Sequence, residues 1–575
     1  MAEPTLPILA KQLLRRSPKP PSTIESAIPT LSIADQPAIT QPIRRRWLAL
    51  LTIVWLVAGL VGHDPWKSEE ALHFGIILEM IEGQQWLMPH IAGQAVFDHP
   101  PLFHWLAATS AWLLSPLLPL HDGARIMSGL FMLGTFSIAA LAARELYGKD
   151  RAVSAILLLM ACLGLILRTH QIIPDTLALC ATAITYFALA LAVRQPLWAG
   201  LWLGIAWGLT LMSVGIAETL TLVLISLLLP IFSRHWRHQS YGYTIAIGLL
   251  VCLPWLLWWP LLVYQANPTH LLAWLSYEWQ SLAFTIQQWP STWAFYLRTV
   301  TWYAFPVWPL TLWSLWRLYR LQQLQNANIV LPLLGAIVTL LTLSVHTQYR
   351  ELYALPLLLP LMLLALPSIG NLRSGTANGW YWFSVMGFTF FMIVGWFYWS
   401  ALDLGLPARL HRHLHTILPG YDFGWNIGRS LLAMCLSALW IGVLAIVARH
   451  PLRPLLIWTA GLTLTWALAN TLFIGWVENA QSYRSMYSQM QRALPAQYRC
   501  LNTLDLGLPQ QAMLHYFAQI RPVRVADSNT ANTCDLLLTQ GKPLDELLVL
   551  APWQIIWEGN RPGDKKERYR LYHRP

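Results

Sequence analysis

Residues 44–70 read RRRWLALLTIVWLVAGLVGHDPWKSEE: three arginines, an uninterrupted apolar run and then a polar stretch. A long apolar run is typical of a helix that enters a bilayer. Because basic residues favour the cytosolic end of such a helix, the arginines predict that the N-terminus of the chain lies in the cytosol. Residues 62–122, which follow the helix, are then expected on the external side.

Similar apolar runs recur as far as residue 477. Hydrophobic residues make up 56% of the 575 residues and charged residues 11%, whereas a soluble domain carries roughly 25% charged residues. Runs near the ~20 residues that cross a bilayer core give about 13 predicted spans, including one that ends near Arg168 and one over 293–316. The predicted fold is mainly α and polytopic, with juxtamembrane helices in the first external loop, 62–122.

The two ends of the chain differ from this apolar region. Residues 1–43 are rich in Pro, Ser and Thr and lack a long apolar run, which predicts a flexible cytosolic extension before the transmembrane domain, 44–477. Residues 478–575 alternate short strand-like and helical runs, typical of a small α/β domain. An odd number of spans places this tail in the periplasm.

Two of the six cysteines, Cys500 and Cys534, lie in the polar tail. In an oxidising periplasm they could form a disulfide, and the alternative is two unpaired thiols. The other four lie within apolar runs, where cysteine is usually a small core residue. The chain has no CxxC or Cys/His spacing, so the sequence does not predict a structural zinc site.

The net charge of +11 does not indicate a nucleic-acid partner. A nucleic-acid-binding protein gathers its Lys and Arg into a patch or an arm. Here these residues stand in small groups between apolar runs, as expected if they fix the membrane topology.

The first external loop concentrates residues that could do chemistry. Carboxylates beside a membrane surface can coordinate a divalent ion or act as a general base, and a histidine can contact a phosphate. The alternative is that an external loop is polar simply because water solvates it. The residues concerned are Asp64, Lys67, Glu69, Glu70, Asp98, His99 and His104.

Two further candidates lie at predicted external helix ends. Asp175 follows Pro174 at a helix start, where a carboxylate either serves the reaction or only complements the helix dipole. Arg350 could hold a phosphate with its planar fork, or could form a local ion pair with Glu351. Acids, histidine and arginine on one face of the membrane point to a reaction on a lipid with a charged head.

Five segments, taken in chain order, resemble the GT-C glycosyltransferases. Glu69-Glu70 stands where that family has an Asp-Glu pair, and residues 83–93 (GQQWLMPHIAG) stand where it has a G-[DN]-W-x-x-P-x-x-x-G segment. Residues 98–101 (DHPP) resemble its acid-Lys-Pro-Pro turn, Pro174-Asp175 its second acid, and residues 350–356 (RELYALP) its R-[DE]-x-Y-x-L-P helix start. The similarity is to the bacterial branch of protein O-mannosyltransferase-like and lipid A aminoarabinose transferase-like enzymes, glycosyltransferase families 39 and 83.

The resemblance implies an activity and a set of roles. Such an enzyme moves a sugar from a polyprenyl-phosphate carrier to a lipid, glycan or protein acceptor on the periplasmic face of the inner membrane. The catalytic acids would be Glu69, Asp98 and Asp175, which could also share a divalent metal ion. The carrier phosphate would be bound by Lys67, His99, Arg350 and Tyr353.

The chain departs from the family at three places. Glu69 replaces Asp, and Asp98-His99 replaces Glu-Lys, which exchanges a permanent cation for a histidine expected to titrate near neutral pH. Ser213-Val214-Gly215 stands where relatives often have Lys-Gly. The missing lysines weaken the case for phosphate binding and leave open a different donor or a member that no longer catalyses. The alternatives to the transferase are a lipid-binding or lipid-transporting protein without catalysis, and another membrane transferase such as a ligase.

Transporters usually place ionisable groups near the middle of the membrane. Most acids of this chain lie in predicted external loops, which favours the transferase. The central prediction is that Glu69, Asp98, Asp175 and Arg350, far apart in the sequence, meet in one pocket.

Overall fold

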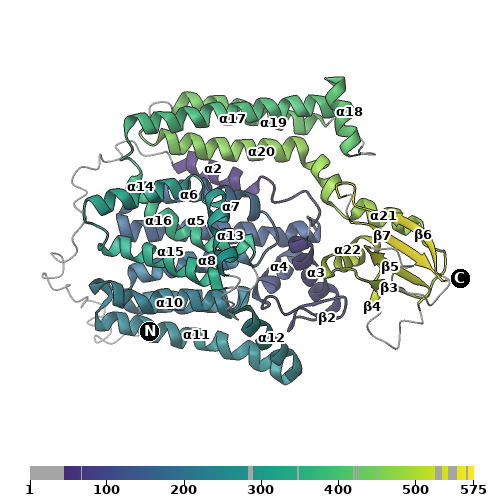
Figure 1. The fold of residues 1–575 in the computed structure, drawn as a ribbon, viewed down its shortest axis with the longest axis horizontal. Helices are drawn as coiled ribbons and strands as arrows, with labels where there is room; N and C mark the ends of the chain where they lie inside the picture. The colour runs from purple at the N-terminus through teal and green to yellow at the C-terminus, as the bar shows by residue number, and fades with distance from the viewer. Residues whose placement is uncertain are drawn as a thin grey trace, which may run out of the picture. The chain divides into compact units, whose positions relative to one another are not determined.

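A computed structural model describes residues 45–66, 68–282, 289–345, 349–418, 421, 424, 426–447, 450–524, 534–541, 553–564 and 567–574. The predicted extension, 1–43, and Lys67 lie outside these residues. Figure 1 shows a bundle of helices followed by a smaller domain that contains a sheet. The mainly α fold with a small C-terminal α/β domain is therefore as predicted.

Eight helical segments of the described residues are long and apolar enough to cross a membrane. The chain is thus a multi-pass membrane protein. The segments are α5 (Leu120–Tyr147), α9 (Pro196–Val214), α11 (Gln239–Ala266), α15 (Ala327–Val345), Glu351–Ser368 (η3 Glu351–Leu357, α16 Leu358–Ala365 and η4 Leu366–Ser368), α17 (Ser374–Asp403), α19 (Ile427–Val447) and α20 (Arg453–Gln481). Four shorter helices are also apolar: α2 (Arg45–Val57), α4 (Leu102–Leu114), α8 (Asp175–Leu191) and α10 (Ile216–Phe232).

The predicted count of 13 spans is not confirmed, and two predicted passes are each divided into short helices. The pass that ends near Arg168 consists of α6 (Ala152–Met160) and α7 (Leu163–Arg168), separated by Cys162 in an extended conformation. The pass over 293–316 consists of α13 (Trp289–Tyr303) and α14 (Val307–Arg320). Pro306 stands at that break, and its ring nitrogen cannot donate the hydrogen bond that would continue a helix. The hydrophobicity of the sequence indicates how long an apolar segment is, but not where its helix is interrupted.

Close packing of α9 against α11 fixes the helices that lead to the site. A Cβ at Gly204 would overlap the Gly248 carbonyl oxygen, and a Cβ at Gly208 would overlap the Trp255 ring. Small residues let membrane helices approach this closely. From α11 the chain passes into α12 (Pro268–Ser281), and Trp274 of α12 lies edge-on to Trp259 of α11 at 5.1 Å.

The first loop, 62–122, contains the predicted juxtamembrane helices. Its elements are α3 (Ser68–Gly83), a short hairpin of β1 (His90–Ile91) and β2 (Gln94–Ala95), and α4. Much of α3 is buried, and it packs on the C-terminal domain so closely that a Cβ at Gly75 would overlap the Cβ of Ala512. The loop is also joined to the bundle, because the indole of Trp259 donates to the Leu87 carbonyl at 2.9 Å.

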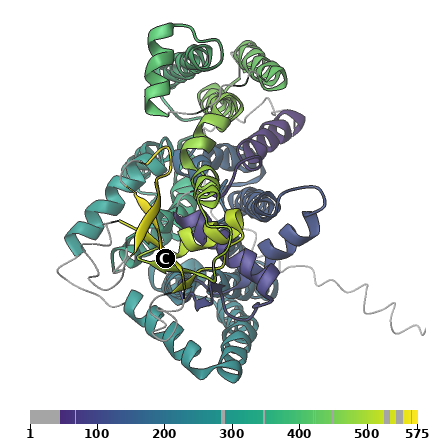
Figure 2. The ribbon, with the colours of Figure 1, turned by 90° about the vertical axis from the view of Figure 1, so that its right-hand side faces the viewer.

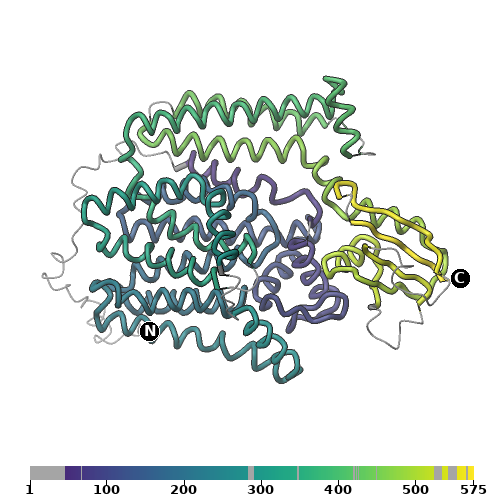
Figure 3. The backbone as a smooth tube through the Cα atoms, in the orientation of Figure 1, coloured from purple at the N-terminus to yellow at the C-terminus, as the bar shows by residue number. Residues whose placement is uncertain are grey.

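The C-terminal domain has a five-stranded mixed sheet in the order β4-β3-β5-β7-β6. Strands β4 and β5 run parallel to β3, while β7 is antiparallel to both β5 and β6. Figure 2 turns this domain toward the viewer, and the trace in Figure 3 can be followed from α20 into α21. Its elements are α21 (Arg484–Arg492), β3 (Leu501–Leu504), α22 (Leu508–Ala518), β4 (Val523–Arg524), β5 (Leu536–Gln540), β6 (Gln554–Gly559) and β7 (Tyr569–His573). The remaining short elements of the described residues are η1 (Lys149–Arg151), η2 (Arg234–Trp236) and α18 (Ala408–Ile417).

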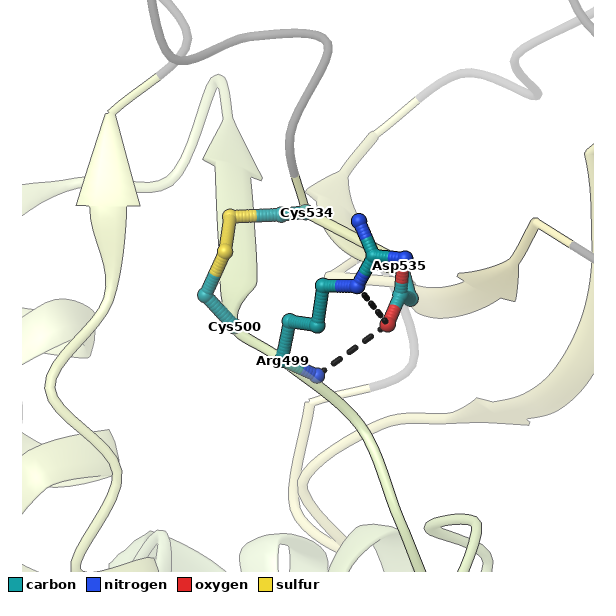
Figure 4. Close-up of a disulfide and its surroundings, with 4 residues drawn as sticks. All are labelled: Arg499, Cys500, Cys534 and Asp535. Atoms are coloured by element: carbon teal, nitrogen blue, oxygen red, sulfur yellow. Dashed lines mark hydrogen bonds and ion pairs between the residues drawn. A yellow bond between two sulfur atoms is a disulfide. The ribbon is translucent and has the colours of Figure 1, made fainter.

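A disulfide between Cys500 and Cys534 joins the starts of the parallel strands β3 and β5 (Figure 4). Beside it, the Arg499 backbone amide donates to the Asp535 carboxylate at 3.1 Å. Both contacts hold the two strand starts together.

Replacing both cysteines by serine is expected to destabilise the C-terminal domain by about 2–4 kcal/mol, because the bond closes a long loop in the unfolded chain. Thermal unfolding of the purified protein with and without reductant measures this loss, and the serine variant should no longer respond to reductant. Non-reducing mass spectrometry of membranes should yield one Cys500–Cys534 linked peptide. Two free thiols in the native protein would contradict the assignment.

Candidate active site

Arg350 lies between two acids of the first loop. Its guanidinium is 3.6 Å from Glu69 Oε2 and 3.7 Å from Asp98 Oδ2. Glu69 belongs to the first turn of α3, Asp98 precedes the two prolines before α4, and Arg350 precedes η3. All three side chains are partly exposed, at 33%, 27% and 29% respectively. Three residues of the predicted set therefore meet where a ligand can reach them.

The local alternative paired Arg350 with Glu351, but the structure gives Glu351 a different partner. Its carboxylate instead accepts a hydrogen bond from Arg168 at 2.5 Å, and Arg168 also donates to the Tyr303 hydroxyl at 3.2 Å. This pair anchors the end of α7 to the start of η3. Arg350 is left facing the loop acids.

Asp175 completes the predicted set from the first turn of α8. Its buried carboxyl lies close enough to Glu69 and Arg350 to interact electrostatically with both. Its place in the first turn also fits the alternative, a carboxylate that complements the helix dipole. Ser213 donates to the Pro174 carbonyl at 2.9 Å. The serine that replaces the family's lysine thus steadies the turn before Asp175.

Tyr277 of α12 is a site residue that the sequence did not predict. Burial and the nearby Asp98 raise the pKa of Tyr277, so its phenol is neutral at physiological pH. Tyr353, predicted from the motif, lies near enough to Arg350 to interact with its charge. One phenol therefore lies near an acid of the site and another near its arginine.

Glu278, next to Tyr277, fixes α12 against the start of α10. Its carboxylate accepts a hydrogen bond from the Ile216 amide at 3.0 Å. Gly215 has a φ of +106°, and a Cβ there would overlap the Glu278 carboxylate. The glycine of Ser213-Val214-Gly215 is thus required by this close approach, which in turn places Tyr277 at Asp98.

The prediction that His99 titrates near neutral pH is wrong. His99 is only 7% exposed, and its ring lies 5.1 Å from that of His73. Burial and then the charge of Arg350 lower the pKa of His99 to about 3, so the ring is neutral at pH 7. It cannot supply the cation that the family's lysine would. Among the described residues its Nδ1 has no hydrogen-bond partner.

The other candidate phosphate and metal ligands gain no support. Lys67 lies outside the described residues. In the part of the chain that the structure describes, no three His, Cys, Asp or Glu side chains are arranged to hold a metal ion. The guanidinium of Arg350 occupies the space between Glu69 and Asp98 that a shared cation would need.

Beneath this site, Glu70 and Arg125 form a buried ion pair at 2.6 Å. Arg125, fully buried in α5, also bonds Asp122 at 2.6 Å and the Asp64 carbonyl at 2.9 Å. Glu70 additionally accepts from the amides of Trp66 at 3.0 Å and Ile172 at 3.3 Å. Although burial raises the pKa of Glu70, the charge of Arg125 brings it below its usual value. The pair therefore ties together the loop before Glu69 and the chain before Asp175.

A second set of contacts joins the first loop to the segment that leads into the C-terminal domain. Arg484 donates two hydrogen bonds to the Asp64 carboxylate at 2.9 and 2.5 Å, and Ser482 donates a third at 2.7 Å. Burial raises the pKa of Asp64, but these bonds outweigh it and lower the pKa to about 2. Glu478 accepts from the Trp66 indole at 2.7 Å and the Asp64 amide at 2.9 Å.

Sequence reasoning missed Arg125, Glu478 and Arg484 as residues that build the site. One signal was available for Arg125, because a charged residue in an apolar helix usually has a partner, and Asp122 stands three residues before it. No local pattern links Arg484 to Asp64, which is 420 residues away in the chain.

Residues 98–258 match the family model described as dolichyl-phosphate-mannose-protein mannosyltransferase. Undecaprenyl phosphate-alpha-4-amino-4-deoxy-L-arabinose arabinosyl transferase of Pseudomonas paraeruginosa is 30% identical over 225 residues, which are 37% of this chain and 40% of that protein. The chain thus spans about 40% of the length of this relative. Another protein of the same name, arabinosyl transferase 2 of Pseudomonas fluorescens, is 26% identical over 435 residues. These residues are 71% of this chain and 76% of that protein.

Among solved structures, ArnT from Cupriavidus metallidurans bound to undecaprenyl phosphate matches with a TM-score of 0.66. The match covers 92% of this chain and 97% of that one at 16% identity. At this identity the likeness establishes the fold, which is that of ArnT. The resemblance to GT-C glycosyltransferases that the motifs indicated is confirmed.

Loss of the buried Glu70–Arg125 ion pair should lower the free energy of unfolding more than loss of an exposed arginine–glutamate pair. Arg125→Leu leaves two carboxylates buried without their cation and is expected to cost about 3–5 kcal/mol. The matched control is Arg194→Leu, because the Arg194 side chain is 64% exposed and pairs with Glu145 at 2.8 Å; its loss should cost less than about 1 kcal/mol. Thermal unfolding in detergent measures both, and equal melting temperatures would contradict the assignment.

Proposed function

We propose that this chain is a glycosyltransferase that moves a sugar from a polyprenyl-phosphate carrier to an acceptor at the periplasmic face of the inner membrane. The observation that carries the proposal is the position of Arg350 between Glu69 and Asp98, on a fold shared with a protein crystallised with undecaprenyl phosphate. The names of the relatives make undecaprenyl phosphate the carrier we favour.

Transfer separates charge in a defined way. An acceptor hydroxyl attacks the anomeric carbon of the sugar while the bond from that carbon to the phosphate oxygen breaks. The phosphate leaves with the bonding electrons and an added negative charge, which a guanidinium stabilises most where water is excluded. The guanidinium of Arg350 lies 3.6 Å from Glu69 and 3.7 Å from Asp98, which supports a place for the leaving phosphate beside both acids.

We assign Glu69 the role of general base that takes the proton from the acceptor hydroxyl, as its partial exposure at the start of α3 permits. Asp98, near Tyr277, orients the donor, and Asp175 sets the electrostatic environment of Glu69 from α8. Arg350 supplies positive charge between the two acids.

One observation favours the second candidate, a lipid-binding or lipid-transporting protein without catalysis. With His99 neutral and buried, the site has less positive charge for a phosphate than the family's lysine would give. A transporter would move labelled lipid across a liposome membrane without an acceptor. A transferase would release free undecaprenyl phosphate only when an acceptor is present.

The proposed organisation follows the sequence: a cytosolic extension at 1–43, a catalytic membrane domain at 44–477 and a periplasmic domain at 478–575. The donor is a polyprenyl-phosphate-linked sugar, and the acceptor is a lipid, a glycan or a protein.

Glu69→Gln and Asp98→Asn are each expected to abolish transfer while the protein remains folded and inserted, since each removes a carboxylate of the reacting site. Release of undecaprenyl phosphate from a radiolabelled donor in proteoliposomes measures the activity. Glu82→Gln, at the other end of the same helix α3, is the control and should retain activity. Full activity in both site variants would remove the assignment.

The orientation predicts which thiols a membrane-impermeant reagent can reach. A cysteine introduced at Gln554, on the exposed face of edge strand β6, should be labelled by a charged maleimide in cells with a permeabilised outer membrane. A tag on the first residues should be digested only after the inner membrane is opened. Labelling of Gln554→Cys only after that opening would place the domain in the cytosol and contradict the proposal.

A further inference from the structure

A pair of histidines stands on one face of α18, the short helix between α17 and α19 (Figure 1). Residues four apart are neighbours on an α-helix, whereas residues two apart do not face each other. His411 and His415 are four apart, and their ring centres lie 4.5 Å from each other with 77° between the ring planes. His413, between them in the sequence, lies on another face and is exposed. The helix therefore presents two imidazoles side by side and a third one apart from them.

The distance between the two rings suits one metal ion held by both. A ring nitrogen binds a transition-metal ion at about 2.0–2.1 Å, which puts each ring centre roughly 3.2 Å from the ion. Two ring centres that lie 4.5 Å apart then subtend about 90° at the ion. This is the angle between neighbouring ligands in the tetragonal sites that Cu²⁺ prefers.

A backbone contact fixes the tautomer of His411. Its Nδ1 lies 2.8 Å from the Ala401 carbonyl oxygen. Because a carbonyl oxygen only accepts hydrogen bonds, Nδ1 carries the proton of the neutral ring and Nε2 carries the lone pair. Metal-binding histidines almost always donate their other ring N–H to a carbonyl, a carboxylate or water in this way. His411 is thus held in the form that binds a metal ion through Nε2.

Apolar contacts hold α18 against the helices around it. Leu414 is 5% exposed and packs in one cluster with Leu402 of α17. Phe473 and Trp476 of α20 lie against the same cluster. The pair His411 and His415 remains partly exposed beside these contacts. The two imidazoles therefore stand on an anchored helix where ions in the surrounding water can reach them.

The surroundings of the pair disfavour an ion that is attracted by charge alone. Arg409 and Arg412 are exposed on the same helix. In the part of the chain that the structure describes, no third His, Cys, Asp or Glu side chain joins the two histidines to hold a metal ion. Mg²⁺ and Ca²⁺ need oxygen ligands, which the pair does not offer. Imidazole instead suits the divalent ions of copper, nickel and zinc.

We propose that His411 and His415 bind one divalent transition-metal ion, Cu²⁺ most tightly, with water in the remaining coordination positions. The usual order of affinities for such ions puts Cu²⁺ above Ni²⁺ and Zn²⁺. Because only two side chains hold the ion, it exchanges with ions in the surrounding water. The bound ion links two consecutive turns of α18, and the site is independent of transfer at Arg350.

A Cu²⁺ titration followed by electron paramagnetic resonance tests the site in the full-length protein without an affinity tag. Glycine in excess removes weakly held Cu²⁺, and the native protein should then retain one ion with a spectrum of nitrogen ligands. His411→Gln and His415→Gln should each weaken binding by about 10–100-fold or more, because loss of even an outer partner of a ligand costs that much. The matched control is His413→Gln, which should bind Cu²⁺ as the native protein does.

Hydrogen exchange gives a second readout on the folded helix. Glutamine favours a helix at least as well as histidine, so without Cu²⁺ residues 408–417 should exchange alike in the native protein and all three variants. Cu²⁺ should slow this exchange several-fold in the native protein and in His413→Gln, and leave the other two variants unchanged. If all three variants lose Cu²⁺ equally, or none does, the ion is adventitious only and the proposal is overturned. Neither measurement uses transfer activity, so that result leaves the proposed function untouched.

Discussion

The site depends on one buried ion pair, Glu70–Arg125. Burying two charges costs several kcal/mol per ion, and the attraction offsets that cost only when further hydrogen bonds satisfy both groups. Here Glu70 accepts from two backbone amides besides Arg125, and Arg125 binds Asp122 and a carbonyl besides Glu70. Because those partners belong to the first loop, to α5 and to the chain before α8, the pair fixes the backbone beneath Glu69 and Asp175 together.

The charges of the first loop fall into two groups with different properties. The group around Arg125 and Asp64 is mostly buried and bonded at 2.5–3.3 Å, and it holds the loop to α5, α20 and the C-terminal segment. The group around Arg350 is partly exposed and its ion pairs are longer, at 3.6 and 3.7 Å. Transfer of a lipid-linked group needs binding groups that are held in position and remain accessible. The buried group holds the backbone in position, and the accessible group around Arg350 can interact with an arriving phosphate.

Much of this was predictable, and the failures have physical causes. Apolar runs and arginine groups gave the membrane character, and the ordered motifs gave Glu69, Asp98, Asp175 and Arg350, which the structure does bring together. The breaks at Cys162 and Pro306 were not predicted, because hydrophobicity carries no information on backbone conformation. The pKa of His99 escaped because it depends on burial beside His73 and Arg350, which come from other segments. Tyr277 was not predicted as a site residue, because its place near Asp98 depends on where Glu278 anchors α12.

The central claim is that the carrier phosphate leaves against Arg350. A structure of this chain with undecaprenyl phosphate bound tests it most directly. The account predicts phosphate oxygens within hydrogen-bond distance of the Arg350 guanidinium, with the Glu69 and Asp98 carboxylates on either side. A phosphate bound at Arg168 or Arg484 instead, with Arg350 still paired with the two acids, would contradict it.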